Sequence, residues 1–241
     1  MPNKEGKLMR VGILCAGDRE AAPFLPLMEG DRITRKAMLT FHEGTIQGIS
    51  VVVLYSGVCK VNAALAAQIL IDTYGVNAIL NAGTAGGMAQ GIDLFDVVIS
   101  TEVAYHDVAA HILTEFHPWM DSVFFPADPE LLRLSRLAAE KMTLESNLFW
   151  GRMVTGETFI ADEGRQAINQ QFAPLSVDME SASIAHVCYV NRIPFLAIRC
   201  MTDTETHSGA GHFEENCDKA AGIAKDVTVA VLRELAERQM F

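Results

Sequence analysis

Short apolar runs that alternate with stretches of helical periodicity constrain this sequence more than any other feature. The runs are rich in Val, Ile and Leu, and they cover Val11–Cys15, Val51–Tyr55, Ala78–Leu80, Val97–Ser100, Leu148–Val154 and Phe195–Ile198. Runs of this length are typical of β-strands that are covered on both faces. Between them, apolar residues recur every three or four positions, most clearly from Phe213 to Leu235. The alternation predicts an α/β fold in which helices cover both faces of one sheet.

The length and composition are those of a folded chain. At ~150 residues per domain, 241 residues correspond to about 1.6 domains, and no change in composition marks a linker. We therefore expect one domain over residues 9–241, preceded by a disordered or flexible extension over residues 1–8. Hydrophobic residues make up 50% of the chain and charged residues 20%, which excludes a disordered protein.

The net charge and the cysteines limit the partners and the location of the protein. A net charge of −11 argues against a nucleic-acid groove and against a partner membrane with anionic lipids. No apolar run reaches the ~20 residues that span a bilayer. The polar start of the chain lacks the apolar core of a signal peptide, and the five cysteines include no Cys-x-x-Cys pair. These features predict a cytoplasmic protein with reduced, buried thiols.

Small or acidic residues follow the apolar runs. Glu20 follows the first run, Ser56–Lys60 the second, Asn81–Gly87 the third, and Asp203 comes shortly after the last. Ligands of open α/β sheets bind outside the carboxyl ends of the strands. We therefore expect these segments to form loops that converge on one pocket.

Four acidic residues stand on or near these expected strand ends: Glu20, Asp178, Glu180 and Asp203. Each taken alone is typical of a helix N-cap or first helical turn. Around a glycine-rich segment, the set suits hydrolysis of a glycosidic bond, because one carboxylic acid protonates the leaving group and one carboxylate activates water. The segment Asn81–Gly87 has neither the Gly-x-Gly-x-x-Gly pattern of a dinucleotide fold nor the Gly-Lys-Ser/Thr of a P-loop.

Several strings together resemble one family, the 5′-methylthioadenosine/S-adenosylhomocysteine nucleosidases of the purine nucleoside phosphorylase superfamily. The likeness runs from about Met9 to the C-terminus, in the same order and at similar spacing. The strings are Gly-Ile-Leu-Cys-Ala-Gly-Asp-Arg-Glu (12–20), Ser-Gly-Val-Cys-Lys-Val-Asn-Ala-Ala (56–64), Asn-Ala-Gly-Thr-Ala-Gly-Gly (81–87), Tyr-His-Asp (105–107), Thr-Gly-Glu-Thr-Phe-Ile (155–160), Val-Asp-Met-Glu-Ser-Ala-Ser-Ile-Ala-His-Val-Cys (177–188) and Arg-Cys-Met-Thr-Asp (199–203).

The resemblance implies a role for each matching acid. Glu20 matches the general base that activates water, and Asp203 matches the general acid that protonates adenine at N7. Glu180 matches the carboxylate that holds the ribose hydroxyls. The implied substrate-binding residues are Met179 under the sugar, Phe159 stacked on adenine, the Ile160 backbone at the base edge, Thr84, Ala85 and Gly86 beside base and ribose, and Phe213 closing the site. Asp178, Arg199 and Thr202 complete this set.

The same resemblance implies the architecture and the reaction. The expected fold is a single-domain, three-layer α/β/α structure with a central mixed, partly barrel-like sheet, as in nucleoside phosphorylases. The implied enzyme hydrolyses the N-glycosidic bond of methylthioadenosine and S-adenosylhomocysteine in methionine salvage, releasing adenine and the 5′-thio-substituted ribose. It acts as a homodimer without cofactor or metal, and its partner is a small adenine nucleoside.

Water is favoured over phosphate as the nucleophile. In the phosphorylases that the chain resembles, arginines hold phosphate, one within Gly-Asp-Pro-x-Arg after the first strand and one at the start of the glycine-rich strand end. Here Arg19 stands two positions too early, and Asn81 occupies the second place. The carboxylate of Glu20 would also repel phosphate. We therefore expect a hydrolase, with Arg19 a solvated loop charge.

The preferred substrate and the reaction class stay open at two points. The segment Val108–Met120 departs from the family pattern at the part implied to reach a neighbouring subunit's alkylthio pocket, so 5′-deoxyadenosine or an aminofutalosine-type nucleoside is an alternative substrate. The chain could also be a purine nucleoside phosphorylase or a catalytically idle nucleoside-binding protein, although binding alone does not require Glu20.

The pairs His106/His111 and His207/His212 are spaced by five residues, which suits neither one helix face nor a zinc site.

Overall fold

The computed structural model describes residues 9–116 and 120–239. The expected extension over residues 1–8 lies outside the described residues, as do residues 117–119 of the divergent segment Val108–Met120. The strands are β1 (Arg10–Cys15), β2 (Glu29–Lys36), β3 (Leu39–Ile46), β4 (Ile49–Tyr55), β5 (Ala78–Gly87), β6 (Val97–Tyr105), β7 (Phe124–Pro126), β8 (Leu148–Thr155), β9 (Ser176–Asp178) and β10 (Phe195–Asp203). The helices are α1 (Asp18–Ala21), the 3-10 helix η1 (Ala22–Leu27), α2 (Lys60–Tyr74), α3 (Ala110–Glu115), α4 (Pro129–Lys141), α5 (Arg165–Phe172), α6 (Ser181–Asn191) and α7 (Ala210–Gln239).

One mixed sheet contains all ten strands, and part of it closes on itself. The strand order is β10-β6-β8-β9-β5-β1-β4-β3-β2, with β7 on β6 and a further pairing between β10 and β5. That additional pairing joins β5, β10, β6, β8 and β9 into a closed five-stranded ring. The predicted three-layer architecture with a mixed, partly barrel-like sheet is confirmed.

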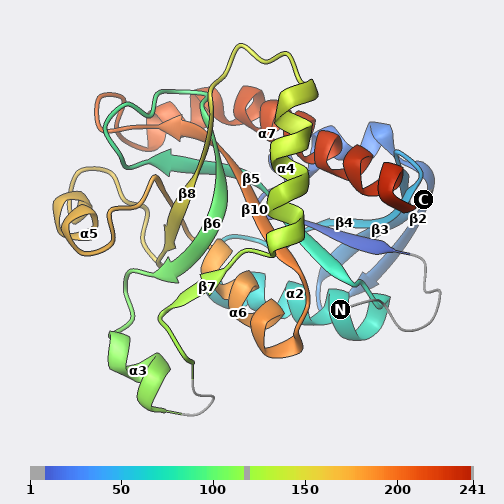
Figure 1. Cartoon of the computed structure of the whole chain (residues 1–241), viewed down its shortest axis with the longest axis horizontal. Helices are drawn as coiled ribbons and strands as arrows, with labels where there is room; N and C mark the ends of the chain where they lie inside the picture. The colour runs from blue at the N-terminus through green and yellow to red at the C-terminus, as the bar shows by residue number, and fades with distance from the viewer. Residues whose placement is uncertain (1–8, 117–119, 240–241) are drawn as a thin grey trace.

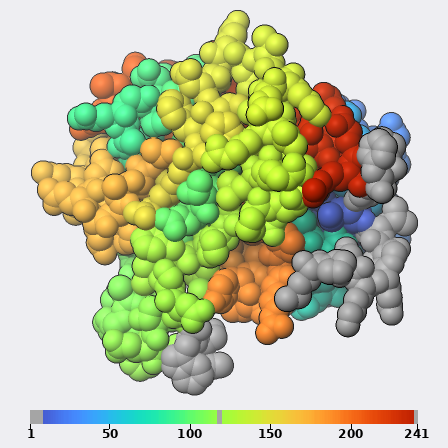
Figure 2. Space-filling model, in the orientation of Figure 1, coloured from blue at the N-terminus to red at the C-terminus, as the bar shows by residue number. Residues whose placement is uncertain are grey.

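Helices cover both faces of the sheet, as the apolar periodicity predicts. Leu131 of α4 and Val231 of α7 belong to one buried cluster, while Ala66 of α2 and Ile184 of α6 belong to another on the opposite side. Figure 1 shows α4 and α7 together, with α2 and α6 side by side below them. The surface view shows α3 projecting at the lower left of the molecule (Figure 2). Within the residues that the structure describes, no helix combines the length and apolarity needed to cross a membrane.

The strands extend further than the apolar runs predict. The sequence predicts loops after Leu80 and Ile198, but β5 continues to Gly87 and β10 continues to Asp203. The two strands pair in parallel along these extensions, with Arg199 beside Gly83 and Asp203 beside Gly86. The small residues of β5 are therefore part of the ring rather than a loop, because they let its neighbours approach the backbone closely.

Several further elements do not show in the apolar pattern, among them the hairpin β2–β3 and the helix α5. The hairpin β2–β3 pairs antiparallel at one edge of the sheet, and β2 reads Glu-Gly-Asp-Arg-Ile-Thr-Arg-Lys. Its side chains are mostly exposed, so nothing in its composition separates it from a polar loop. The short helix α5 is likewise absent from the pattern. Pro23 and Pro26, by contrast, shorten the first helix as expected, because α1 gives way to η1 at Ala22.

The N-terminus of α4 gives a test of this local structure. The Asp128 carboxylate accepts hydrogen bonds from the backbone N–H groups of Glu130 and Leu131, at 3.0 and 2.9 Å. We expect Asp128→Ala to lower the free energy of unfolding by about 1 kcal/mol, because two helix N–H groups lose their acceptor. Urea denaturation measures this, with Asp121→Ala at an exposed site as the control. Equal unfolding midpoints for the two variants would contradict the capping role.

Candidate active site

A cavity of about 360 Å³ lies at the carboxyl ends of β1, β5, β9 and β10. It is lined by three groups of residues: Ala16, Gly17, Asp18, Arg19, Glu20 and Val58; Thr84, Ala85, Gly86, Phe159, Val177, Asp178, Met179 and Glu180; and Thr202, Asp203, Phe213, Glu214 and Cys217. All the site residues predicted from the sequence are among them, except Ile160 and Arg199. Ile160 lines a small adjoining hollow, which it shares with Phe159 and Asp203.

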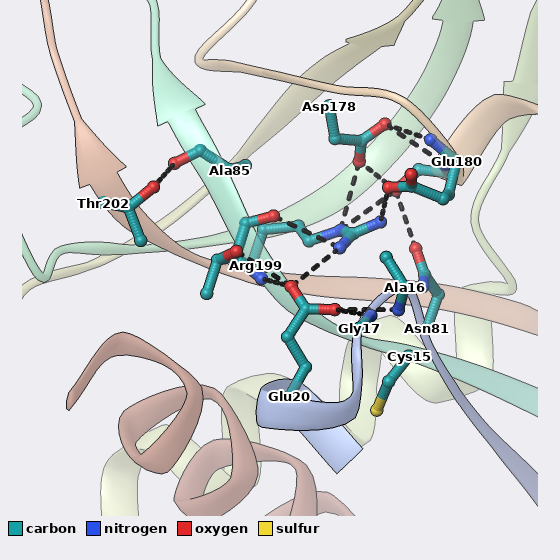
Figure 3. A network of polar contacts seen from close by, with 12 residues as sticks. Cys15, Ala16, Gly17, Glu20, Asn81, Ala85, Asp178, Glu180, Arg199 and Thr202 are labelled. Atoms are coloured by element: carbon teal, nitrogen blue, oxygen red, sulfur yellow. Dashed lines mark hydrogen bonds and ion pairs between the residues drawn. The ribbon is translucent and has the colours of Figure 1, made fainter. Parts of the chain in front are cut away.

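Arg199 lies beneath this cavity and holds three carboxylates together. Its side chain is fully buried. Its Nε lies 3.1 Å from Oδ2 of Asp178, its Nη2 lies 3.2 Å from Oε2 of Glu180, and its Nη1 lies 3.8 Å from Oε1 of Glu20. Figure 3 shows the guanidinium at the centre of these contacts. Arg199 therefore organises the site from below, whereas the family resemblance implies a substrate-binding residue at this position.

Glu20 is fixed by four hydrogen bonds. Its Oε2 accepts from the backbone N–H groups of Ala16 and Gly17, at 2.7 and 3.0 Å. Its Oε1 accepts from the N–H and the hydroxyl of Thr84, at 2.6 and 2.8 Å. Glu20 can approach this strand so closely only because residue 83 is glycine. A Cβ on Gly83 would lie 2.5 Å from Oε1 of Glu20. The four donors therefore hold the Glu20 carboxylate in one orientation at the edge of the cavity.

Glu180 stands at the start of α6, on the opposite side of Arg199. Its Oε1 accepts a hydrogen bond from the backbone N–H of Cys59, at 3.0 Å. Cys59 adopts φ 85° and ψ 162°, a conformation that residues other than glycine seldom adopt. Burial raises the pKa of Glu180 to about 7, although the Arg199 guanidinium acts in the opposite direction.

Asp178 mainly holds neighbouring elements of the structure together. Its Oδ1 accepts from the Thr155 hydroxyl at 2.6 Å, from the Ser181 N–H at 3.0 Å and from the Glu180 N–H at 3.2 Å. Its Oδ2 contacts Arg199 and the Ser181 hydroxyl. This carboxylate thus connects β8, β9, β10 and the first turn of α6.

Asp203 differs from the other acids, because it lies away from Arg199 and keeps one oxygen free. Its Oδ1 accepts a hydrogen bond from the Thr202 hydroxyl at 2.9 Å. Its Oδ2 is buried without a hydrogen-bond partner, in a residue that is 1% exposed. Burial raises the pKa of this carboxyl, while the Thr202 hydroxyl and the charges of Arg165 and His212 oppose that rise. The free oxygen can therefore carry a proton toward a ligand in the cavity.

Two aromatic rings border the same end of the cavity. Phe159 and Phe213 meet edge to face, with ring centroids 6.4 Å apart. Phe159 is 41% exposed, and Met179 lines the cavity as well. A planar heterocycle can stack against such rings.

The cavity also has a charged rim that the sequence pattern does not predict. Arg19 donates to Glu214 and Asp218 of α7, at 2.9 and 2.6 Å. Arg19 is therefore paired rather than solvated alone, and α1 is joined to the first turns of α7. Glu214 and Cys217 also line the cavity, although they are not among the residues predicted from the sequence. They lie one turn apart on the helix that carries Phe213, and this spacing is the sequence signal that could have identified them.

In the described parts of the chain, no three His, Cys, Asp or Glu side chains are arranged to hold a metal ion. All five cysteines are free thiols, of which Cys15, Cys188, Cys200 and Cys217 are buried. The residues that line the cavity offer carboxyl groups, hydroxyls and aromatic rings from their side chains, and amides from their backbone, to a ligand.

A closed five-stranded ring in a three-layer fold, with carboxyl groups around a cavity at its strand ends, is the architecture of the phosphorylase superfamily. The family model described as "Phosphorylase superfamily" matches residues 10–233. A 5′-methylthioadenosine/S-adenosylhomocysteine nucleosidase from Bacillus cytotoxicus is 34% identical over 233 residues, which cover 94% of this chain and 100% of the relative.

Solved structures give the same result. A nucleosidase of this name from Colwellia psychrerythraea, in complex with adenine, has a TM-score of 0.87 and 31% identity, covering 95% of this chain and 96% of its own. The enzyme from Neisseria meningitidis, in complex with methylthio-immucillin-A, has a TM-score of 0.86 and 28% identity, covering 94% and 99%. The chain belongs to the 5′-methylthioadenosine/S-adenosylhomocysteine nucleosidase family.

Removal of the central cation tests the electrostatics of the site. We expect Arg199→Met to lower the free energy of unfolding by about 3–5 kcal/mol, because three buried carboxylates lose their counter-ion. The loss should be larger at pH 8 than at pH 5, because burial raises the pKa of Glu180 to about 7 and its protonation at pH 5 removes one of the three negative charges. Urea denaturation at both pH values measures it, with Arg133→Met as the control, because Arg133 pairs with Glu130 at the surface. A loss as small as that of the control would contradict this account.

Proposed function

We propose that this protein hydrolyses the N-glycosidic bond of 5′-methylthioadenosine and S-adenosylhomocysteine, releasing adenine and the 5′-thio-substituted ribose. One observation carries the proposal: two carboxyl groups bound by donors, Glu20 and Glu180, face a third, Asp203, whose Oδ2 is free in the same cavity. The names of the related enzymes supply the substrate. A planar base and a sugar match the aromatic end and the carboxylate end of the cavity.

The leaving base receives its proton from Asp203. As the C–N bond breaks, negative charge develops on adenine and positive charge on the sugar. A proton moved from Oδ2 of Asp203 to N7 neutralises the base and leaves a carboxylate on Asp203. Burial raises the pKa of Asp203 and so favours the protonated form before the reaction.

The other two acids, Glu180 and Glu20, bind the sugar and activate the water. Glu180 accepts hydrogen bonds from the ribose hydroxyls, and this favours its ionised form in the complex although burial raises its pKa in the free protein. Glu20 accepts a proton from the water that attacks the anomeric carbon. Its four donors fix the carboxylate in place before the reaction.

The pattern of charges supports water over phosphate as the nucleophile. Phosphate needs cations that are not already neutralised. At the end of the cavity that holds Glu20, Arg199 is surrounded by three carboxylates and Arg19 pairs with Glu214 and Asp218. Asn81, at the second place where related phosphorylases carry arginine, donates its amide to the Leu14 carbonyl.

The activity is tested by incubating the protein with 5′-methylthioadenosine in phosphate-free buffer and measuring free adenine. We expect adenine release that added phosphate does not accelerate. Asp203→Asn should lower kcat about 10²–10⁴-fold with little change in KM, because the proton is needed only in the transition state. Asp162→Asn, outside the cavity, is the control. The proposal fails if no adenosine derivative yields adenine.

The pH dependence tests the role of Glu180. Below pH 7 the protonated carboxyl accepts ribose hydroxyls less well, so kcat/KM should fall about tenfold per pH unit well below this value. Glu180→Gln should have a low kcat/KM and should lose this acidic limb. A profile that stays flat from pH 8 to pH 5 in the parent protein would remove Glu180 from the binding step.

We also propose that the enzyme is a cytoplasmic homodimer. The five free thiols suit a reducing compartment. Exposed apolar side chains gather on neighbouring helices: Val61 and Leu65 on α2, Tyr189 and Val190 on α6. The Asn191 amide donates to Gln68, so these helices are in contact. Further exposed apolar residues are Val58 beside the cavity and Ile112 on α3. Burial of such a patch by a second copy is favourable.

Sedimentation of charge variants tests the homodimer. Val61, which is 78% exposed, should lie at the interface, so Val61→Glu should shift the protein toward a monomer. Ile33→Glu, at an equally apolar exposed position on the hairpin β2–β3, is the matched control and should leave the mass unchanged. A monomeric parent protein at micromolar concentration would contradict the proposal.

A further inference from the structure

Arg165 is a buried arginine without a carboxylate partner. It is the first residue of α5 and is 4% exposed. Its Nε donates to the Ala161 carbonyl at 2.9 Å, and its Nη1 donates to the Gly87 carbonyl at 2.5 Å. Its Nη2 is buried with no hydrogen-bond partner, and none of the described acidic side chains lies within 4.0 Å of the guanidinium. Arg199, which is fully buried, has three such partners.

The position of Arg165 relates it to one acid in particular. Arg165 binds the carbonyl of Gly87, which is the last residue of β5. The preceding residue, Gly86, pairs with Asp203 of β10. A Cβ on Gly86 would lie 2.9 Å from Oδ2 of Asp203. The free oxygen of Asp203 therefore lies against Gly86, and the guanidinium of Arg165 binds the next residue, Gly87. Neither glycine carries a side chain.

A buried charge without a counter-ion is costly, and its field acts strongly on nearby groups. The charge of Arg165 opposes the effect of burial on Asp203 and lowers the pKa of that carboxyl. Asp203 bears no proton after the proposed transfer to N7, so the negative charge that Arg165 lacks at rest appears at that step. The cation is thus placed to favour the products of proton transfer over its reactants.

We propose that Arg165 is a positioning residue for the general acid, stabilising through its uncompensated charge the carboxylate that Asp203 becomes when it protonates the base. The inference rests on the proposed function, because it needs a proton to leave Asp203. Through its bonds to Ala161 and Gly87, Arg165 also ties the segment after Phe159 and Ile160 to the end of β5, so its charge is held at a fixed place beside the site.

Several charged groups besides Arg165 face the same region and stay constant when Arg165 changes. His212 on α7 acts on Asp203 with the same sign as Arg165. Asp162 and Glu205 line the outer hollow that Arg165 borders, of about 660 Å³. The remaining charged groups around the cavity are Asp18, Arg19, Glu20, Asp178, Glu180 and Glu214, with Arg199 beneath it.

The test compares the pH dependence of kcat for adenine release in Arg165→Met, Arg165→Lys and the parent protein. The activity requires protonated Asp203, so it falls on the alkaline side as that proton is lost. Without the cation the acid holds its proton more tightly and donates it less readily. We expect the alkaline limb of Arg165→Met to move up by about one pH unit and kcat on the plateau to fall about tenfold.

Arg165→Lys separates the charge from the hydrogen bonds, since lysine keeps the cation but not the forked contact with two carbonyls. It should restore the alkaline limb to its place in the parent. Asn169→Ala is the matched neutral control: Asn169 on the same helix donates to the Met88 carbonyl at 3.1 Å, and its loss should not move the limb. Arg165→Gln replaces the methionine variant if that variant does not fold, as judged by circular dichroism.

An unmoved alkaline limb in a folded neutral variant would overturn the inference, even if KM changes. A limb that moves equally in Arg165→Lys and Asn169→Ala would also overturn it, because the effect would then come from the segment's position. These outcomes differ from failure of the proposed function, in which the parent protein itself releases no adenine.

Discussion

The site depends on one buried guanidinium. Arg199 has no exposure to solvent, and its charge is balanced by Glu20 near the start of the chain and by Asp178 and Glu180 at the junction of β9 and α6. Removing so many charges from water is unfavourable unless donors and acceptors meet in good geometry. The backbone amides of Ala16, Gly17 and Cys59 and the hydroxyls of Thr84, Thr155 and Ser181 supply that geometry. The site is therefore held ready before any ligand enters.

The closed ring of strands determines where these groups meet. The pairing of β10 with β5 places Arg199 beside Gly83 and Asp203 beside Gly86. A side chain on Gly83 would collide with both Glu20 and Arg199, so the absence of one makes room for the carboxylates. The same pairing separates Asp203 from Arg199, which lets one acid keep a proton while the others accept hydrogen bonds. Two buried arginines thus have different surroundings, one neutralised and one not.

The sequence predicted the architecture well where its apolar pattern was strong. The runs Val11–Cys15 and Val51–Tyr55 are strands, and the stripe from Phe213 to Leu235 lies in α7. The pattern failed where polar or small residues form strands. The hairpin β2–β3 is polar because it is exposed, and the ends of β5 and β10 are small or charged because they pack against the site. In both cases tertiary pairing overrides the local signal.

By itself, the sequence determined the sheet-and-helix framework, the family resemblance and the acids that surround the cavity. It did so because buried strands and helices need apolar side chains at fixed periods. The short motifs also occur in the same order and at similar spacing as in the family that the chain resembles. Only the tertiary structure decided the state of each charged group. Whether Arg199 lines the cavity or lies beneath it, and whether Arg165 has a counter-ion, depend on distances between residues far apart in the chain. Electrostatic energy in a protein interior varies with those distances and with burial, which local sequence does not specify.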